Sequence, residues 1–88
     1  MKSNYSMTVY TMSFCPACSR IKRWLKVNDV SFTEKNIRND QDSYEEFQKA
    51  GFKYTPTIII KTENETHTIV GADTQKINEI LSTETISK

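Results

Sequence analysis

The sequence of 88 residues contains few of the residues that mark special classes of protein, with only two cysteines, two glycines and two prolines. Two cysteines are too few for the disulfide framework of a small secreted domain. The longest apolar run surrounds residues 58–60 and is far shorter than the roughly 20 residues of a membrane-spanning helix. Residues 1–6 include a lysine, but no apolar stretch follows it as a secretory signal would require. We therefore expect a cytoplasmic protein without membrane association.

Neither sign of charge dominates the chain. Twelve basic and eleven acidic side chains leave a net charge of +1, which excludes an overall electrostatic footprint for nucleic acid. The overall composition, with 36% apolar and 26% charged residues, is that of an ordinary globular domain. A chain of this length forms one domain, so we expect residues 1–88 to be a single monomeric unit with an ordered core over about 6–82.

The spacing of apolar residues predicts seven elements in the order β-α-β-α-β-β-α. Ser43 to Glu46 matches a capping box for the second helix, and Asp73 or Thr74 is the expected cap of the third. The most apolar strand is expected at the centre of the sheet, and the tail over 83–88 is expected to fray. The predicted strands are 6–11, 30–37, 57–62 and 66–70, and the predicted helices begin near 16, 43 and 74 and end near 28, 50 and 82.

The first functional signal is the motif Cys15-Pro16-Ala17-Cys18. A bridge between cysteines only three residues apart closes a very short loop and adds little stability, so its value is chemical. A helix that begins just after Cys15 directs unpaired backbone N–H groups and its positive dipole end at the sulfur. In such motifs the thiol pKa falls from about 8.5 to roughly 3.5–7.5. Cys15 is therefore the candidate nucleophile, and Cys18, one turn later, resolves the mixed disulfide.

Two metal-binding interpretations of the motif are weaker. A structural zinc ion needs four ligands, and beyond the cysteines the chain offers only His67 and carboxylates. A copper-chaperone motif would need Met12 one residue closer, and Pro16 would stiffen a loop that must surround the metal. We therefore expect no metal ligands at this site.

The second signal is Pro56, which directly precedes the isoleucine-rich strand. Proline cannot donate to the hydrogen-bond ladder, so its position before a central strand needs an explanation. A cis peptide bond between Thr55 and Pro56 provides one, because cis bonds are largely confined to proline.

Together these features resemble the glutaredoxins of the thioredoxin superfamily over about residues 6–82. The resemblance implies a thioredoxin-like α/β fold, a four-stranded mixed sheet flanked by three helices, no tightly bound cofactor, and glutathione as a co-substrate. It also implies a dithiol enzyme that reduces protein or glutathione mixed disulfides. The matching motifs are Val9-Tyr10-Thr11, Cys15-Pro16-Ala17-Cys18, Thr55-Pro56 and Gly71-Ala72-Asp73.

The resemblance also assigns roles around the cysteines. The residue before the cis-proline, Thr55, clamps the substrate backbone beside Pro56, with Tyr54 next to it. Asp73, preceded by Ala72, takes the position that binds the γ-glutamyl end of glutathione.

Several glutathione-contacting positions depart from the usual pattern, which predicts weak glutathione binding. The family commonly has lysine or arginine at Met12, tyrosine at Ala17, threonine-valine at Tyr54-Thr55 and cysteine at Ala72. The main alternative is therefore a glutaredoxin-like redoxin that thioredoxin reductase reduces and that serves, for example, ribonucleotide reductase. The usual Ser-Gly-Phe-Arg-Pro tail of that group is absent. An iron–sulfur or other metal-binding module and a non-catalytic interaction domain are the lesser alternatives.

Two features beside the cysteines have more than one interpretation. Phe14, directly before the nucleophile, is a candidate apolar lip for protein substrates. The basic residues of the first helix form a solvated face in the simplest interpretation, and otherwise a docking patch for an acidic partner or glutathione carboxylates; they are Arg20, Lys22, Arg23 and Lys26.

Overall fold

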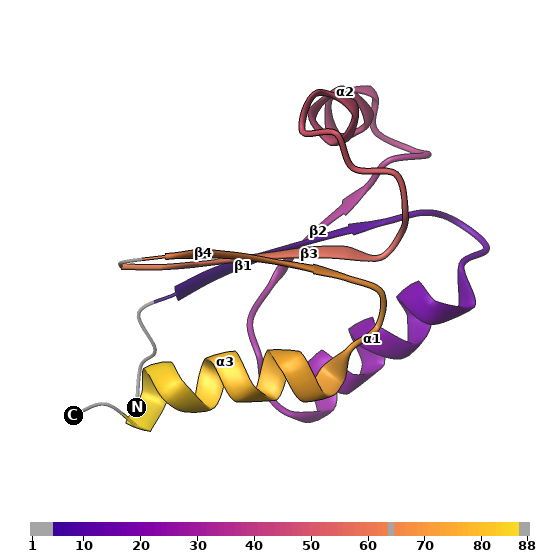
Figure 1. Ribbon diagram of the computed structural model, residues 1–88. Helices are drawn as coiled ribbons and strands as arrows, with labels where there is room; N and C mark the ends of the chain where they lie inside the picture. The colour runs from indigo at the N-terminus through magenta and orange to yellow at the C-terminus, as the bar shows by residue number, and fades with distance from the viewer. Residues whose placement is uncertain (1–4, 64, 87–88) are drawn as a thin grey trace.

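The computed structural model describes residues 5–63 and 65–86, and it confirms the predicted order of strands and helices (Figure 1). The elements are β1 (Tyr5–Thr11), α1 (Pro16–Val27), β2 (Thr33–Asn36), α2 (Gln41–Lys49), β3 (Thr57–Thr62), β4 (Thr66–Val70) and α3 (Thr74–Ile86). Among the described residues, no helix is both long and apolar enough to cross a membrane.

The four strands form one mixed sheet in the order β2-β1-β3-β4. β1 runs parallel to β2 and antiparallel to β3, and β4 runs antiparallel to β3. Val9 of β1 therefore lies between Glu34 of β2 and Ile58 of β3. The isoleucine-rich strand occupies an interior position, as its composition predicts.

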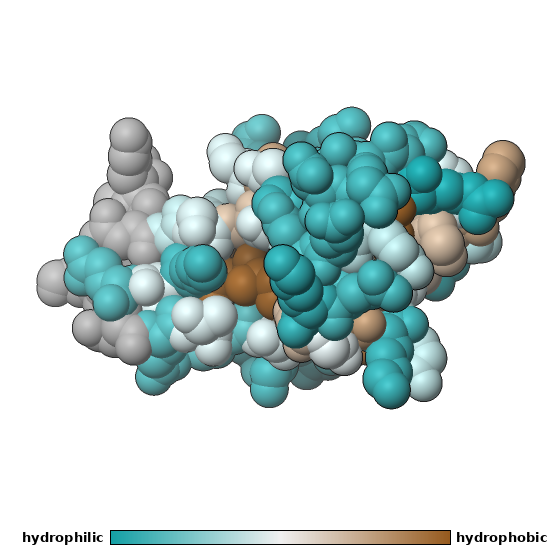
Figure 2. Space-filling model, turned by 90° about the horizontal axis from the view of Figure 1, so that it is seen from above, coloured by the Kyte–Doolittle hydropathy of each residue, from teal (hydrophilic) through white to brown (hydrophobic). Residues whose placement is uncertain are grey.

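The main core lies between the sheet and the two helices α1 and α3, which run beneath it in Figure 1. Alternate strand residues point into this layer, and the helices contribute residues three or four positions apart. α2 lies alone on the opposite face, where Figure 2 shows a mostly hydrophilic surface around one hydrophobic patch. The buried cluster consists of Met7, Val9, Ile21, Leu25, Ile58, Ile60, Ile69, Ile77 and Ile80.

The predicted second strand is wrong in its first half, because residues 30–32 lie outside β2. Asp29 takes a positive φ of 57°, and the N–H of Val30 donates to the carbonyl of Leu25 at 2.9 Å. These residues therefore close the end of α1. Val30 and Phe32 are partly buried and pack against the core, which removes them from the strand.

Two predicted helix boundaries are also wrong. α2 begins at Gln41 rather than 43, because the Asp40 carboxylate accepts the backbone N–H of Ser43 at 3.2 Å and caps the helix earlier. A capping serine at 43 is excluded, since Ser43 is itself buried within the first turn. α3 continues to Ile86, beyond the predicted end near 82, and the rest of the expected frayed tail, 87–88, lies outside the described residues.

Candidate active site

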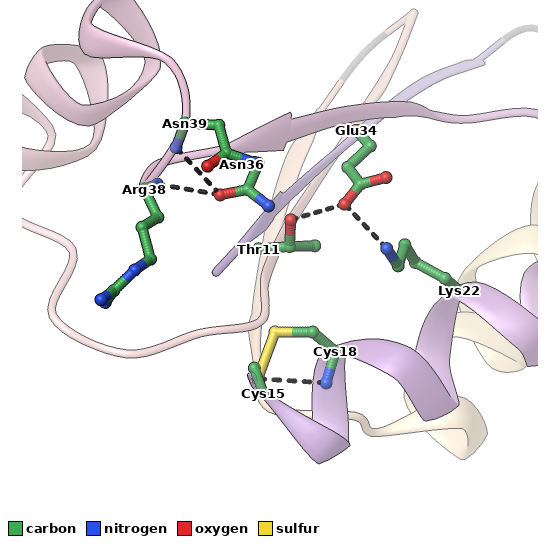
Figure 3. A network of polar contacts seen from close by, with 8 residues as sticks. All are labelled: Thr11, Cys15, Cys18, Lys22, Glu34, Asn36, Arg38 and Asn39. Atoms are coloured by element: carbon green, nitrogen blue, oxygen red, sulfur yellow. Dashed lines mark hydrogen bonds and ion pairs between the residues drawn. A yellow bond between two sulfur atoms is a disulfide. The ribbon is translucent and has the colours of Figure 1, made fainter. Parts of the chain in front are cut away.

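Cys15 and Cys18 lie at the N-terminal end of α1 and form a disulfide (Figure 3). Cys15 is the N-cap residue, and the backbone N–H of Cys18 donates to its Sγ at 3.2 Å. The Cys18 side chain is buried, whereas Cys15 is half-buried. Pro16 occupies the first helical position, where a backbone N–H would have no helical partner. The Cys15 residue is therefore the more accessible of the two.

The charges along α1 favour an anionic sulfur at its N-terminus. The first turn of α1 has no acidic residue, and residues 12–28 include four basic and no acidic side chains. The exposed N–H groups and the dipole of the helix add positive potential at the same point. A helix end of this kind is the environment that favours a thiolate in such motifs.

Thr55 and Pro56 lie against Cys15, although 40 residues separate Thr55 from Cys15 along the chain. The Thr55 carbonyl oxygen is 3.9 Å from the Cys15 Sγ, and the Thr55 hydroxyl donates to the same sulfur at 3.7 Å. The peptide bond between Thr55 and Pro56 is cis, which confirms the sequence prediction. Pro56 is buried, whereas Tyr54 is exposed beside it.

The candidate glutathione residues Ala72 and Asp73 lie in the turn before α3, next to the loop that contains the cis-proline. The Gly71 N–H donates to the Pro56 carbonyl at 2.8 Å, which ties the turn before α3 to the cis-proline. Ala72 packs against the core, and Asp73 is exposed. The Asp73 carboxylate accepts the backbone N–H of Lys76 at 3.1 Å, so Asp73 caps α3 as predicted.

A polar network behind the cysteines was not found from the sequence (Figure 3). Glu34 Oε2 accepts hydrogen bonds from the buried Thr11 hydroxyl at 2.7 Å and from Lys22 Nζ at 2.9 Å. Burial raises the pKa of Glu34, but the hydrogen bonds from Lys22 and Thr11 outweigh it and hold that pKa below its ordinary value. Only the register of β1 against β2 brings these groups together. Of the four basic residues expected on the solvated face of α1, Arg20, Arg23 and Lys26 are exposed, whereas Lys22 is half-buried and pairs with Glu34.

An open groove of about 590 Å³ runs past the disulfide. Its wall includes Met12, Phe14 and Lys22 from the α1 side and Asn36 from the end of β2. The Phe14 side chain is 94% exposed, and Arg38 Cζ lies 6.0 Å from the centre of its ring. Sequence analysis proposed Phe14 as a lip but did not identify Arg38.

No group of three or more histidine, cysteine, aspartate or glutamate side chains suited to a metal ion occurs among residues 5–63 and 65–86. His67 is half-buried on β4, and its Nε2 lies 3.1 Å from the Glu65 carboxylate.

A cysteine pair that caps the first helix, facing a cis-proline on a four-stranded mixed sheet, defines a redox protein of the thioredoxin fold. The family model for Glutaredoxin matches residues 7–64, and the chain belongs to the glutaredoxin family. This family of thiol oxidoreductases carries its redox chemistry on such a pair, here Cys15 and Cys18.

Individual relatives agree with this assignment. The glutaredoxin-like protein NrdH of Lactococcus lactis subsp. cremoris is 33% identical over 52 residues, which cover 59% of this chain and 72% of the relative. The crystal structure of the thioredoxin-like protein BC3987 matches with a TM-score of 0.74 and 27% identity, over 86% of this chain and all of that one. The Chlamydomonas reinhardtii thioredoxin f2 structure, at 17% identity and a TM-score of 0.73, shows the shared fold over the whole chain and 85% of its own length.

A second group of relatives consists of transcriptional regulators. The global transcriptional regulator Spx 1 of Bacillus cereus is 28% identical over 84% of this chain. The match spans 50% of that relative's length, so it concerns only part of the regulator.

Proposed function

We propose that this protein is a dithiol reductase of protein disulfides, with Cys15 as the nucleophile and Cys18 as the resolving thiol. The observation that carries the proposal is the hydrogen bond from the Cys18 N–H to the Cys15 Sγ at the start of α1. This donor is available to a thiolate at the same position. Cys18 is buried beneath Cys15, so its sulfur is not exposed to attack a substrate disulfide directly.

The reaction transfers two electrons in two exchange steps. The Cys15 thiolate attacks one sulfur of a substrate disulfide, forms a mixed disulfide and releases the other sulfur as a thiolate. The Cys18 thiol then loses its proton and attacks the Cys15 Sγ, which releases the second substrate thiolate and leaves Cys15 and Cys18 oxidised. The protons of the protein dithiol end on the two substrate thiols.

Thr55 and Pro56 provide the substrate-binding edge in this proposal. The Thr55 carbonyl lies 3.9 Å from the reacting sulfur, so its backbone can pair with an extended substrate segment that presents its disulfide to Cys15. Tyr54 is exposed next to this edge and offers an aromatic contact.

Glutathione is proposed as a poor co-substrate. Asp73 offers a carboxylate to the γ-glutamyl ammonium, while Met12 provides no cation for the glycyl carboxylate and Ala17 no hydroxyl. A lost hydrogen bond to a charged group costs about 1.5–3 kcal/mol. Arg20, one candidate substitute for the missing cation, lines a groove with Ala72 and Thr74, which places it nearer the γ-glutamyl end of the proposed site than the glycyl carboxylate.

Thioredoxin reductase is the second candidate electron donor. The relative named glutaredoxin-like protein NrdH favours keeping this alternative, because the chain matches it over 72% of its length. Met12 and Ala17, which lack the cation and the hydroxyl for glutathione, are compatible with a protein whose disulfide is reduced by another protein. We further propose a cytoplasmic monomer without a tightly bound cofactor.

One coupled assay tests both donors. NADPH oxidation is measured with a protein disulfide substrate and either glutathione with glutathione reductase, or thioredoxin reductase alone. We expect turnover with at least one donor, low turnover with glutathione, and none with Cys15→Ser under either condition. Absence of turnover with both donors, together with failure of the dithiothreitol-reduced protein to reduce any disulfide, would contradict the proposed function.

A further inference from the structure

Phe14 is unusual both in its exposure and in its backbone conformation. Its side chain is 94% exposed, and its φ of 62° lies in the left-handed region that bulky residues rarely adopt. An aromatic residue at such a position gains no core burial in return for the unfavourable backbone. The conformation instead holds the ring in solvent directly before the reacting Cys15. Strained residues of this kind concentrate at functional sites.

Further exposed apolar side chains lie around the disulfide. Met12 is 38% exposed and lines the same groove as Phe14 and Cys15. Tyr54 is 69% exposed and precedes Thr55, whose carbonyl lies against Cys15 Sγ on the other side of the site. An apolar rim of this kind is suited to contact with a protein rather than with a small polar tripeptide.

Arg38 adds a cation to this rim. Its guanidinium lies over the Phe14 ring, with 6.0 Å between Cζ and the ring centre, a geometry that favours a cation–π contact. The Asn36 side chain accepts the backbone N–H groups of Arg38 and Asn39 at 2.9 and 3.2 Å, which fixes the turn that carries the arginine (Figure 3). Within the part of the chain that the structure describes, Arg38 forms no ion pair.

The two chain segments that include Cys15 and Thr55 are basic although the whole chain is nearly neutral. Residues 12–28 contain four basic and no acidic side chains, and residues 49–61 contain three basic and no acidic ones. Lys22 is already neutralised by Glu34 at 2.9 Å. Arg38 forms no ion pair among the described residues, so its planar guanidinium, with a pair of donors that matches a carboxylate, is available to a partner.

We propose that Phe14 and Arg38 form a specificity element, here called the Phe14–Arg38 lip, for a disulfide-bearing segment of another protein with an acidic side chain close to the attacked cysteine. The inference rests on the proposed disulfide reduction and names its substrate class. In the complex, the ring contacts the apolar part of the segment and the guanidinium binds the carboxylate, while Cys15 Sγ attacks the adjacent sulfur.

The test uses pre-reduced protein in single-turnover reactions, so that no electron donor enters the measurement. Three peptide disulfides differ only at the residue next to the cysteine, which is glutamate, glutamine or lysine. The small substrate 2-hydroxyethyl disulfide reports the intrinsic thiol reactivity. The variants are Arg38→Gln, Arg38→Glu and Phe14→Asn, with Arg23→Gln as the matched control on an exposed arginine of α1. Asparagine tolerates the left-handed backbone at position 14.

We expect the wild type to react about tenfold faster with the glutamate peptide than with the lysine peptide at low salt, since charge complementarity acts on association rates. Arg38→Gln should remove most of this preference and Arg38→Glu should reverse it, while Arg23→Gln retains it. Phe14→Asn should slow all three peptides by a larger factor than it slows 2-hydroxyethyl disulfide.

Three outcomes would contradict the proposed role of the Phe14–Arg38 lip. Equal rates of the wild type with all three peptides, or equal losses in Arg38→Gln and Arg23→Gln, remove the specificity. Glutathione disulfide serves as a fifth substrate, and a loss of activity in Arg38→Gln with this substrate alone would assign the arginine to a glutathione carboxylate instead. If the wild type reduces none of these disulfides, it is the proposed function that fails rather than the specificity alone.

Discussion

The two helices beneath the sheet begin in different ways, and the difference separates the redox chemistry from glutathione binding. α1 is capped by the sulfur of Cys15, which accepts the Cys18 N–H. α3 is capped by the carboxylate of Asp73, which accepts the Lys76 N–H. Both helix ends offer unpaired donors and a positive dipole end to an anion.

At α1 the group that satisfies the helix end is also the group that reacts. The donors therefore stabilise the thiolate that attacks the substrate. At α3 the capping carboxylate does not react, and in the proposed function it is the ligand for the γ-glutamyl ammonium of glutathione. The proposed weakness of glutathione binding therefore comes from Met12 and Ala17 rather than from this helix end.

Removal of the sulfur cap should have the largest effect. Cys15→Ser should abolish disulfide reduction, because a serine hydroxyl at this position is not ionised near neutral pH. Cys18→Ser should instead retain the first exchange and accumulate a mixed disulfide on Cys15, detectable by mass spectrometry of the intact protein. Preferential alkylation of Cys18 over Cys15 in the reduced wild type near pH 6 would contradict the assignment.

A change at the first helical position should have an intermediate effect. Pro16→His restores a backbone N–H at the helix end and adds an imidazole that can be protonated, and both favour the thiolate of the reduced form. We expect the redox potential to rise by tens of millivolts, where about 30 mV corresponds to 1.4 kcal/mol. Equilibration with glutathione buffers measures the redox potential. An unchanged potential would show that the residue at position 16 does not affect the stability of the Cys15 thiolate, and that the Cys18 N–H is sufficient.

At the other helix end, Asp73→Ala should lower glutathione-dependent turnover several-fold while leaving reduction by dithiothreitol unchanged. Two losses contribute, since the alanine removes the ligand carboxylate and an N-cap worth about 1 kcal/mol. Asp73→Asn separates them, because asparagine retains the cap and loses the charge. Equal glutathione activity in Asp73→Asn and the wild type would mean that the carboxylate makes no contact with the γ-glutamyl ammonium.

The smallest effect is expected at the Glu34 carboxylate that neutralises Lys22 of α1. Its folded-state pKa is lowered, so the ion pair stabilises the fold above the unfolded pKa and that stability is lost as the pH falls through the folded pKa. Glu34→Gln should therefore reduce the free energy of unfolding near pH 7 by less than about 1 kcal/mol, because the pair is partly exposed. Urea unfolding of the oxidised wild type and variant at pH 7 and pH 3 should show that their difference in free energy of unfolding is smaller at pH 3. The same difference at both pH values would assign the effect to packing.

The order of the elements and the residues of the redox loop were predictable from the sequence. Local patterns determine both, since β3 and β4 are short runs rich in β-branched residues on either side of a turn, and Pro16 suits the first turn of a helix. The cis peptide bond at Pro56 was predictable because proline before a central strand leaves few alternatives.

Boundaries that depend on tertiary contacts were not predictable in the same way. The first residue of α2 depends on which side chain accepts the free N–H groups of the first turn. Asp40 and Ser43 both match a capping pattern, and in the structure Asp40 is the acceptor. The Thr11 to Glu34 contact depends on the register of a parallel strand pair, and the proximity of Arg38 to Phe14 depends on where two separate loops meet. Sequence spacing carries no information on either.

The short length of β2 also has a consequence for motion. β3 is bonded on both sides along nearly all of its length, whereas β2 pairs with β1 over only four residues and forms an edge of the sheet. Opening β2 therefore breaks few hydrogen bonds, and opening β3 disrupts the core. The two sides of the disulfide thus differ in stiffness: Thr55 enters the best-protected strand, while the turn that carries Arg38 leaves the least protected one. A partner would meet a backbone edge anchored in the centre of the sheet on one side of the reacting sulfur, and on the other a charged turn whose local hydrogen bonds hold its shape while the short edge strand before it can open.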